Sequence, residues 1–200
     1  MLKRTFDAAL SAAGLVVSMP LWGLIAAAIA LEDGGPVFFN QDRVGFRGET
    51  FRAFKFRSMV PHAGSMPPEQ AGERDPRVTR VGRVLRATAM DELPQLLNIL
   101  RGDMSFVGPR PLVPGEIERR GSGELVPLAS IPGYDERHSV RPGLTGLTQI
   151  YAPRDAVRAR KFRLDAIYVR NAHFCFDLYL IALSFWITAT GRWEIRTRKV

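Results

Sequence analysis

Asp91 and Glu92 are adjacent carboxylates in the segment "RATAMDELPQLLNIL". Pro94 follows them closely and Gly102 stands beyond a run of leucines, so we expect a helix that begins at Asp91 and ends at Gly102. Acidic residues at a helix start usually cap the backbone and complement the helix dipole. The pair alone therefore predicts no chemistry.

Three basic residues stand in settings that favour phosphate binding. Arg86 precedes Asp91 by five positions, and Arg110 stands between two prolines, whose fixed backbone angles limit where its guanidinium can point. Lys55 stands between two phenylalanines in an expected strand, so it projects from the opposite face toward an anionic ligand or toward solvent.

Carboxylates beside phosphate-binding cations have two chemical uses. They can hold Mg²⁺, which prefers oxygen ligands, or attack phosphorus to form an aspartyl phosphoester. The dipole of the expected helix and a bound Mg²⁺ would both keep Asp91 ionised at neutral pH. Because phosphoryl transfer needs mainly positioning and charge stabilisation, these residues together predict a phosphate-handling site.

An apolar run over 8–31 carries no charge and has Pro20 near its middle. A straight helix of that length reaches about 36 Å, enough to cross a hydrocarbon core of about 30 Å. Pro20 removes an amide donor and clashes with the preceding turn, whereas Ser18 can cover a freed backbone group with its hydroxyl. Both a kinked spanning helix and two halves of about 18 Å that enter and leave on one face fit these residues.

The residues on either side of this run bear on its topology. Lys3 and Arg4 precede it, so the positive-inside tendency holds the N-terminus in the cytoplasm, and a spanning helix would export a strongly basic domain. The run is too long for the apolar core of a signal peptide and lacks a small-residue cleavage site before Glu32 and Asp33. We therefore expect the segment to stay attached.

The composition limits the class of partner. The 28 Lys and Arg exceed the 20 Asp and Glu, which favours nucleic acid, a lipid surface or a phosphorylated substrate without choosing among them. The single Cys175 excludes an internal disulfide framework, and the three histidines have no zinc-ligand spacing. The chain has no nucleic-acid recognition motif with the expected spacing, which argues against that partner.

Periodicity and turn residues predict the remaining elements. Alternation on both sides of 45–49 predicts a β-hairpin, and the proline- and glycine-rich segment 61–76 predicts a loop. Helical spacing predicts a short amphipathic segment over 77–85 and a helix over 156–168. The uncharged run 178–191 is short for a membrane span, so it predicts either a buried helix or an interfacial one, the latter favoured by Trp186, Trp193 and the arginines that follow.

Several segments resemble those of the small bacterial sugar transferases, the monotopic phosphoglycosyl transferases. They are "LKRTFD" before an apolar stretch with Ser18 and Pro20, "FKFRSM", "DELPQLLNILRGDMSFVGPRP", "VRPGLTGLTQI" and "KFRLDAIYVRN". The resemblance covers nearly the whole chain, and the block from Asp91 to Pro111 is highly specific. It implies transfer of a sugar phosphate from a UDP-sugar to a polyprenyl (undecaprenyl) phosphate, with release of UMP, as the first membrane step of glycoconjugate assembly.

The resemblance also implies roles for individual residues. Asp91 would be the nucleophile that forms a covalent phosphosugar intermediate, with Glu92 beside it and Mg²⁺ at both. The candidates for phosphate or substrate binding are Lys55, Arg86, Arg110 and Asp165. The implied fold class is α+β, with a re-entrant membrane helix over 1–33 broken at Ser18 and Pro20, and a catalytic domain over 34–200 with a small β-hairpin and amphipathic interfacial helices.

The same resemblance predicts a location and partners. The site would lie at the cytoplasmic face of a bacterial inner membrane, in contact with phospholipid, and the exposed apolar helices could support a homodimer. A noncatalytic lipid-binding protein and a basic nucleic-acid-binding domain are the rival classes. The segments 61–76 and 115–138 are where we expect sugar selection, but their residues do not specify a sugar.

Overall fold

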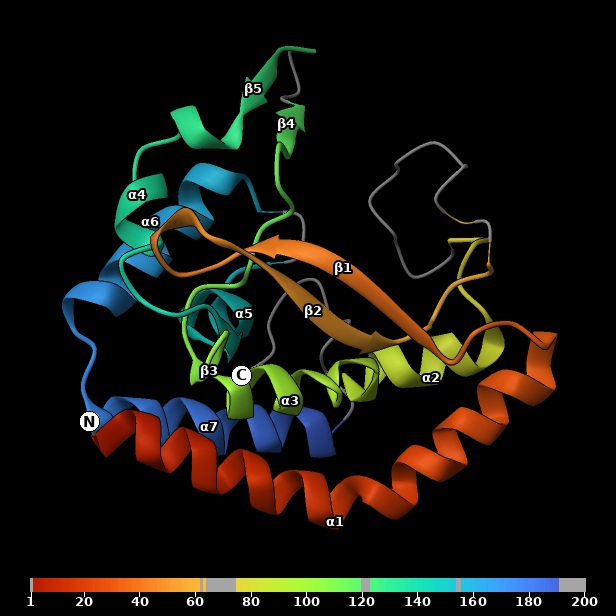
Figure 1. Ribbon diagram of the computed structural model, residues 1–200. Helices are drawn as coiled ribbons and strands as arrows, with labels where there is room; N and C mark the ends of the chain where they lie inside the picture. Colours follow the sequence, from red (N-terminus) through yellow and green to blue (C-terminus); the bar gives the residue numbers. More distant parts are fainter. Residues whose placement is uncertain (1, 62, 64–74, 120–122, 154–155, 191–200) are drawn as a thin grey trace.

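The computed structural model describes residues 2–61, 63, 75–119, 123–153 and 156–190. Within these residues the fold is α+β: helices surround three two-stranded sheets, as the sequence predicts for the fold class (Figure 1). The segment in which a loop was expected over 61–76 lies mostly outside the described residues, as do Trp193 and the C-terminal arginines.

Helix α1 (Leu2–Asp33) is a single helix that continues through Pro20. Figure 1 shows that its two halves run in different directions, so the chain bends where the resemblance implies a break. The Ser18 hydroxyl donates to the Leu15 carbonyl at 3.4 Å and accepts from the Trp22 indole at 3.1 Å. The carbonyl that loses its helical donor to Pro20 is that of Val16, whereas the Ser18 hydroxyl bonds to Leu15, so these contacts add to the turn before the proline and do not replace the lost hydrogen bond. The predicted helix-break-helix is therefore corrected to one bent helix.

Both ends of α1 are attached to the same folded body. At the N-terminal end, the Lys3 ammonium lies 2.6 Å from the Asp177 carboxylate. At the C-terminal end, Glu32 accepts the backbone amide of Arg80 at 2.6 Å, and Arg57 donates to Asp33 at 2.7 Å. The helix therefore leaves the body and returns to it.

The expected hairpin is confirmed by β1 (Phe38–Val44) and β2 (Thr50–Phe56), which are antiparallel and joined through η1 (Phe46–Gly48). Lys55 pairs with Phe39, so the alternation of a strand places Lys55, Gln41 and Arg43 on one face of the hairpin. The side-chain oxygen of Asn98 accepts a hydrogen bond from the Phe54 backbone amide at 3.0 Å, which attaches the hairpin to the helix that contains Asn98.

The segment that carries the acidic pair is two elements and not the predicted single helix. Asp91 and Glu92 lie in the 3-10 turn η3 (Met90–Glu92), and α3 (Gln95–Arg101) begins after Pro94. Asp91 is therefore not a helix N-cap, which corrects that expectation. The turn is preceded by Ala89 in the left-handed region at φ 56°, a strained backbone for a non-glycine residue. Gly102 ends α3 at φ 99°, as the sequence predicts.

The remaining elements complete the body around this turn. They are α2 (Arg80–Ala87), β3 (Ser105–Val107) paired in parallel with β6 (Gly143–Thr145), β4 (Ile117–Arg119) paired with β5 (Leu125–Pro127), η4 (Leu128–Ser130), α4 (Tyr134–Arg137), α5 (Leu147–Tyr151), α6 (Arg158–Arg170) and α7 (Phe174–Ala189). The main core lies where α3, β3, α5, α6 and α7 meet, and it includes Ile99, Met104 and Leu180. In Figure 1 the helices α1, α3 and α7 lie together on one side of the hairpin.

Helix α7 has buried and exposed residues, and its position at a membrane interface stays a prediction. Leu180 and Ile187 are buried in the main core, whereas Phe185 and Trp186 are exposed. By length and composition α1 is long and apolar enough to cross a membrane, and α7 is a shorter apolar helix. Both helices therefore present apolar side chains on the outside of the fold.

Candidate active site

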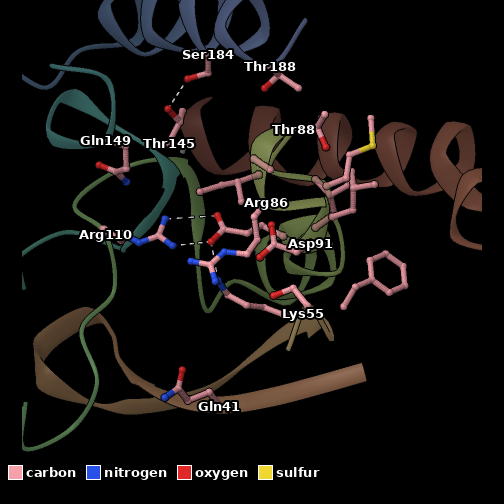
Figure 2. A pocket seen from close by; sticks show the side chains of 18 of the residues that line it. Gln41, Lys55, Arg86, Thr88, Asp91, Arg110, Thr145, Gln149, Ser184 and Thr188 are labelled. Carbon is pink, nitrogen blue, oxygen red and sulfur yellow. Dashed lines mark hydrogen bonds and ion pairs between the residues drawn. The ribbon is translucent and has the colours of Figure 1, made fainter. Parts of the chain in front are cut away.

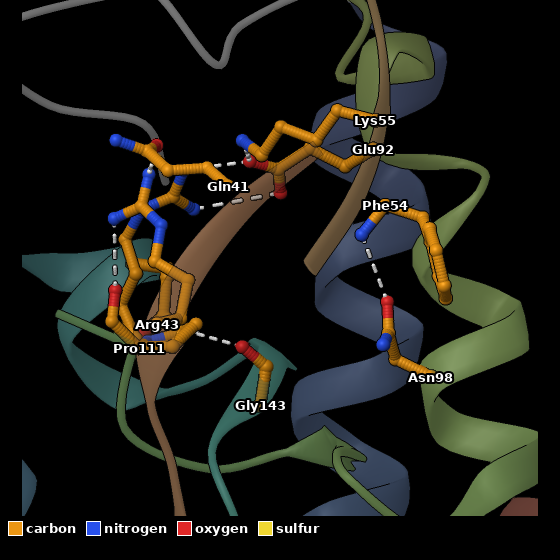
Figure 3. Close-up of polar contacts among 10 residues, drawn as sticks. Gln41, Arg43, Phe54, Lys55, Glu92, Asn98, Pro111 and Gly143 are labelled. Atoms are coloured by element: carbon orange, nitrogen blue, oxygen red, sulfur yellow. Dashed lines mark hydrogen bonds and ion pairs between the residues drawn. The ribbon is translucent and has the colours of Figure 1, made fainter. Parts of the chain in front are cut away.

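Glu92 is held by two cations. Lys55 Nζ and Arg110 Nη2 both lie 2.6 Å from Glu92 Oε1, and Arg110 Nη1 lies 3.5 Å from Oε2 (Figure 3). These ion pairs hold the pKa of the buried Glu92 carboxyl well below its usual range. Glu92 is thus a fixed anion that positions two cations contributed by β2 and by the loop after β3.

Asp91 has a different environment although it is the adjacent residue. Within the described part of the chain, no hydrogen bond or ion pair holds its carboxylate. Burial raises the pKa of Asp91 to about 6, with a further contribution from the neighbouring charge of Glu92, while Lys55, Arg110 and Arg86 act in the opposite direction. A carboxylate without hydrogen-bond donors keeps its lone pairs available, so Asp91 is the member of the pair suited to nucleophilic attack.

These groups face one cavity of about 1190 Å³. Figure 2 shows Lys55, Arg86, Asp91 and Arg110 around a common space, with Gln41 on the hairpin on one side and the residues of α7 on another. Arg86 comes from α2, and burial lowers the pKa of its guanidinium while the charge of Asp91 opposes that change. The structure therefore brings together the acidic pair and all three predicted basic residues.

The sequence reasoning missed Arg43, a further cation in this cavity. Its Nη1 donates to the Pro111 carbonyl at 3.2 Å and its Nη2 to Gln41 Oε1 at 2.6 Å (Figure 3). Burial lowers its pKa to about 10, and the positive charge of Arg110 contributes to the same change. The signal was present in the strand alternation, because residue 43 shares the face of the hairpin that carries Lys55.

Asp165 lines the same cavity as the acidic pair and is held there by other residues. Its Oδ2 accepts Arg137 Nε at 2.9 Å and its Oδ1 accepts the Thr148 hydroxyl at 2.6 Å, and both members of the ion pair are buried. Arg137 also donates a short hydrogen bond to the backbone carbonyl of Arg110. Asp165 therefore holds Arg137, a residue that the sequence reasoning did not select, and through Arg137 it supports the backbone that carries Arg110.

The two residues of the expected helix break lie differently with respect to the cavity. Ser18 lines it, together with other residues of α1, whereas Pro20 is exposed and is not part of its lining. Among the described residues there is no group of three or more His, Cys, Asp or Glu side chains that could hold a metal ion by itself. Of the carboxylates that line the cavity, Asp91 and Glu92 are the two beside Lys55, Arg86 and Arg110, so they are the candidate oxygen ligands for a metal ion.

Comparison with known proteins identifies the family. The family model "Bacterial sugar transferase" matches residues 1–191. The chain is 42% identical over 188 residues to an undecaprenyl-phosphate glucose phosphotransferase of Komagataeibacter xylinus, covering 91% of this chain and 35% of that protein. It is 39% identical to the exopolysaccharide production protein ExoY of Rhizobium meliloti, covering 90% of this chain and 82% of that one.

A third relative is the UDP-glucose:undecaprenyl-phosphate glucose-1-phosphate transferase of Escherichia coli, which is 38% identical over 92% of this chain and 39% of its own length. The chain thus spans little more than a third of two of these relatives and most of another. It belongs to the bacterial sugar transferase family, which confirms the resemblance seen in its motifs.

Proposed function

We propose that this chain transfers a sugar 1-phosphate from a UDP-sugar to undecaprenyl phosphate and releases UMP, through a covalent intermediate on Asp91. The observation that carries the proposal is the contrast within the acidic pair: Glu92 is buried and fixed by two cations, whereas Asp91 is half-buried, lines the cavity and has no hydrogen-bond partner among the described residues. UDP-glucose is the first donor to test, because two of the relatives are named for glucose or glucose 1-phosphate transfer to undecaprenyl phosphate.

The proposed reaction has two displacements at the phosphorus that carries the sugar. In the first, an Asp91 carboxylate oxygen forms a bond to that phosphorus, and the bond to the bridging oxygen breaks so that UMP leaves with the electron pair. In the second, a phosphate oxygen of undecaprenyl phosphate attacks the same phosphorus, and the Asp91 carboxylate is released. Each step exchanges one phosphorus–oxygen bond for another, so the reaction needs no oxidant or reductant.

The cations of the cavity match the charge that these steps develop. Arg110 and Lys55 are fixed by Glu92, and Arg43 is fixed by Gln41 and a backbone carbonyl, so their positions are set before the substrate binds. Arginine donors arranged in a planar fork suit two phosphate oxygens at once. We assign Lys55, Arg86, Arg110 and Arg43 to binding the diphosphate of the donor. We assign Asp165 to positioning Arg110 through Arg137.

The chemistry of the acidic pair fits Mg²⁺. Proteins usually hold this ion through one or two carboxylates together with substrate phosphates and water, and Asp91 and Glu92 offer those carboxylates beside the proposed diphosphate site. When bound, Mg²⁺ would neutralise charge on the phosphate oxygens and favour the ionised form of Asp91. Among the described residues Glu92 Oε2 has only the 3.5 Å contact with Arg110, so that oxygen is the less engaged of the two.

We further propose that α1 is re-entrant and that the site faces the cytoplasm. Both ends of α1 contact the same body, through Lys3 at one end and Asp33 at the other, which is easier to satisfy if the helix enters and leaves on one side of the bilayer. A UDP-sugar is soluble in the cytosol, whereas undecaprenyl phosphate offers only its head group at the interface. A shallow bent helix lets one site reach both substrates. Contact with phospholipid follows from the exposed apolar residues of α1, and a homodimer stays a prediction.

Topology can be tested with single cysteines. In a Cys175→Ser background, cysteines that replace Leu2 and Ile117, both exposed, should react with a membrane-impermeant maleimide only after the cells are permeabilised. Labelling of one of these positions, but not the other, from outside intact spheroplasts would contradict the re-entrant arrangement.

The activity itself is tested by UMP release. Purified chain in nanodiscs is mixed with UDP-glucose, undecaprenyl phosphate and Mg²⁺, and we expect UMP and a lipid-linked sugar phosphate to form. Asp91→Asn, which keeps the size of the side chain and removes its negative charge, should abolish both. A lipid-binding protein would release no UMP with any UDP-sugar, and a nucleic-acid-binding domain would instead show steeply salt-dependent binding to duplexes.

A further inference from the structure

The cavity that contains Asp91 has two chemically different ends. In Figure 2 the labelled residues extend from Gln41 on the hairpin, past Lys55 and Asp91, to Ser184 and Thr188 on α7. At the α7 end the cavity lies between α1 and α7. Its apolar or small lining residues there are Leu10, Ala13, Val17, Leu21, Ile181 and Phe185. The charged end matches a diphosphate, whereas the opposite end is mainly apolar and its polar groups, such as the Ser184 and Thr188 hydroxyls, carry no charge.

The walls of this apolar end are open to the outside of the fold. Val17 on α1 is 80% exposed and Phe185 on α7 is 64% exposed, although both line the cavity. Neither the run 8–31 nor the run 178–189 contains an acidic or basic residue. Large apolar side chains that remain exposed along a groove mark a surface that meets lipid or an apolar ligand.

Contacts near the N-terminal ends of α1 and α7 set the distance between these two helices. The Phe6 and Phe174 rings meet edge to face with centroids 5.2 Å apart, and the Lys3–Asp177 ion pair lies beside them. Further along, Ser184 is tied to Thr145 of β6 by a short hydrogen bond between hydroxyls. The groove between the later turns is therefore formed by the fold without a ligand.

We propose that the groove between α1 and α7, defined by Val17, Leu21, Ile181 and Phe185, holds isoprene units of the acceptor beyond the two nearest its phosphate and thereby aims that phosphate at Asp91. This inference rests on the proposed function. The continuity of the groove with the Asp91 end argues for a chain attached to a phosphate, because only such a ligand would occupy both ends. A phospholipid acyl chain shares the apolar chemistry of the groove, so the test must separate the two.

The first test compares two substitutions at neighbouring valines of α1. Val17→Trp fills the groove, whereas Val16→Trp places the same ring at a position that is 71% exposed and does not line the cavity. Both variants should give the wild-type burst of UMP from UDP-glucose in the absence of acceptor, because that step does not use the groove. Val17→Trp should lower kcat/KM for undecaprenyl phosphate about tenfold, equivalent to roughly 1.4 kcal/mol, and leave kcat/KM for geranyl phosphate, which has two isoprene units, much less affected.

A second pair of variants removes apolar surface without adding bulk. Phe185→Ala should weaken the preference for the long acceptor over geranyl phosphate, whereas Trp186→Ala, at a neighbouring residue that is 59% exposed and outside the cavity lining, should not. This pair keeps the proposal testable even if Val17→Trp does not fold.

The possible outcomes distinguish a failure of the groove assignment from a failure of the proposed transferase function. Equal kcat/KM values for Val17→Trp and Val16→Trp with undecaprenyl phosphate would overturn the groove assignment. So would an equal loss with long and short acceptors, which is the result expected if the groove holds phospholipid. If wild type releases no UMP from any UDP-sugar, the proposed function itself fails. A selective loss for the long acceptor in Val17→Trp, or in Phe185→Ala but not Trp186→Ala, supports the groove.

Discussion

Replacing Asp91 with Asn should make the metal-free protein more stable at neutral pH. The pKa of Asp91 is raised from 3.8 to about 6 by burial and by the adjacent Glu92. Between these two values the folded state holds a proton that the unfolded state has released, so the free energy of unfolding falls as pH rises through this window. Above about pH 6 the whole penalty is present. A difference of about 2 pKa units corresponds to about 3 kcal/mol.

The assay is thermal unfolding in detergent with EDTA, because a bound cation would itself favour the ionised carboxylate. At about pH 7.5, Asp91→Asn should raise the melting temperature by about 6–12 °C, and the gain should disappear toward about pH 4, where wild type is protonated as well. A substitution at the adjacent Glu92 is the control for this experiment. Since ion pairs lower the pKa of Glu92, its charge stabilises the fold above its unfolded pKa, and Glu92→Gln should be destabilising at about pH 7.5.

Two results would refute this reasoning. One is a melting temperature of Asp91→Asn below that of wild type at about pH 7.5, which would mean that the Asp91 charge is stabilised by its surroundings and not destabilised by desolvation. The other is a gain of the same size at about pH 4, which would trace the effect to packing and not to charge.

Three further predictions concern the surroundings of the pair. Asp165→Ala leaves the buried Arg137 guanidinium without its carboxylate partner. It should lower the free energy of unfolding, measured by denaturant titration, by about 3–5 kcal/mol. A decrease below about 1 kcal/mol would contradict the importance of this buried ion pair. Gly82→Ala places a Cβ 2.1 Å from the Ser58 carbonyl oxygen and should cost about 1–3 kcal/mol, whereas Gly23→Ala, with no atom within 4 Å, should stabilise α1 by about 0.5–1 kcal/mol. Equal effects of the two substitutions in thermal unfolding would argue against the packing of α2 on the segment that follows β2. Arg43→Ala should reduce kcat/KM for the UDP-sugar about 10- to 100-fold in the UMP assay, the loss expected for hydrogen bonds to a charged group, and an unchanged value would remove Arg43 from the donor site.

Much of the site could be predicted because the relevant signals are local. The alternation of apolar and polar residues predicted the hairpin. In the hairpin Lys55 pairs with Phe39, and the Lys55 side chain contacts Glu92 of the acidic pair. The prolines on either side of Arg110 indicated a constrained arginine, and that arginine does meet Glu92. These features depend on short-range backbone rules, which a sequence displays directly.

Other features depend on tertiary contacts that no local rule contains. Asp91 has the spacing of a helix cap, but the left-handed backbone at Ala89 begins a 3-10 turn and moves the start of α3 past Pro94. Left-handed geometry at an alanine is locally unfavourable, so only the surrounding packing specifies it. Arg137 was missed for a similar reason, because its partners, Asp165 and the Arg110 carbonyl, are 28 and 27 positions away.

The bend of α1 shows how far a single residue constrains a fold. Pro20 indicated a discontinuity in the apolar run, and the helix does change direction, yet it remains continuous through residue 33. Its course depends on attachments at both ends, including Lys3 with Asp177 and Arg57 with Asp33. Those pairs join segments distant in sequence, and they become visible only in three dimensions.

The covalent role of Asp91 is tested most directly by trapping the intermediate. The chain is incubated with UDP-glucose and Mg²⁺ without acceptor, quenched, and analysed by intact mass and by peptide mapping. We predict one added hexose phosphate, located on the peptide that contains Asp91, which disappears when undecaprenyl phosphate is added and never forms in Asp91→Asn. Turnover by wild type with no adduct at any quench time, or an adduct that forms equally in Asp91→Asn, would contradict the account.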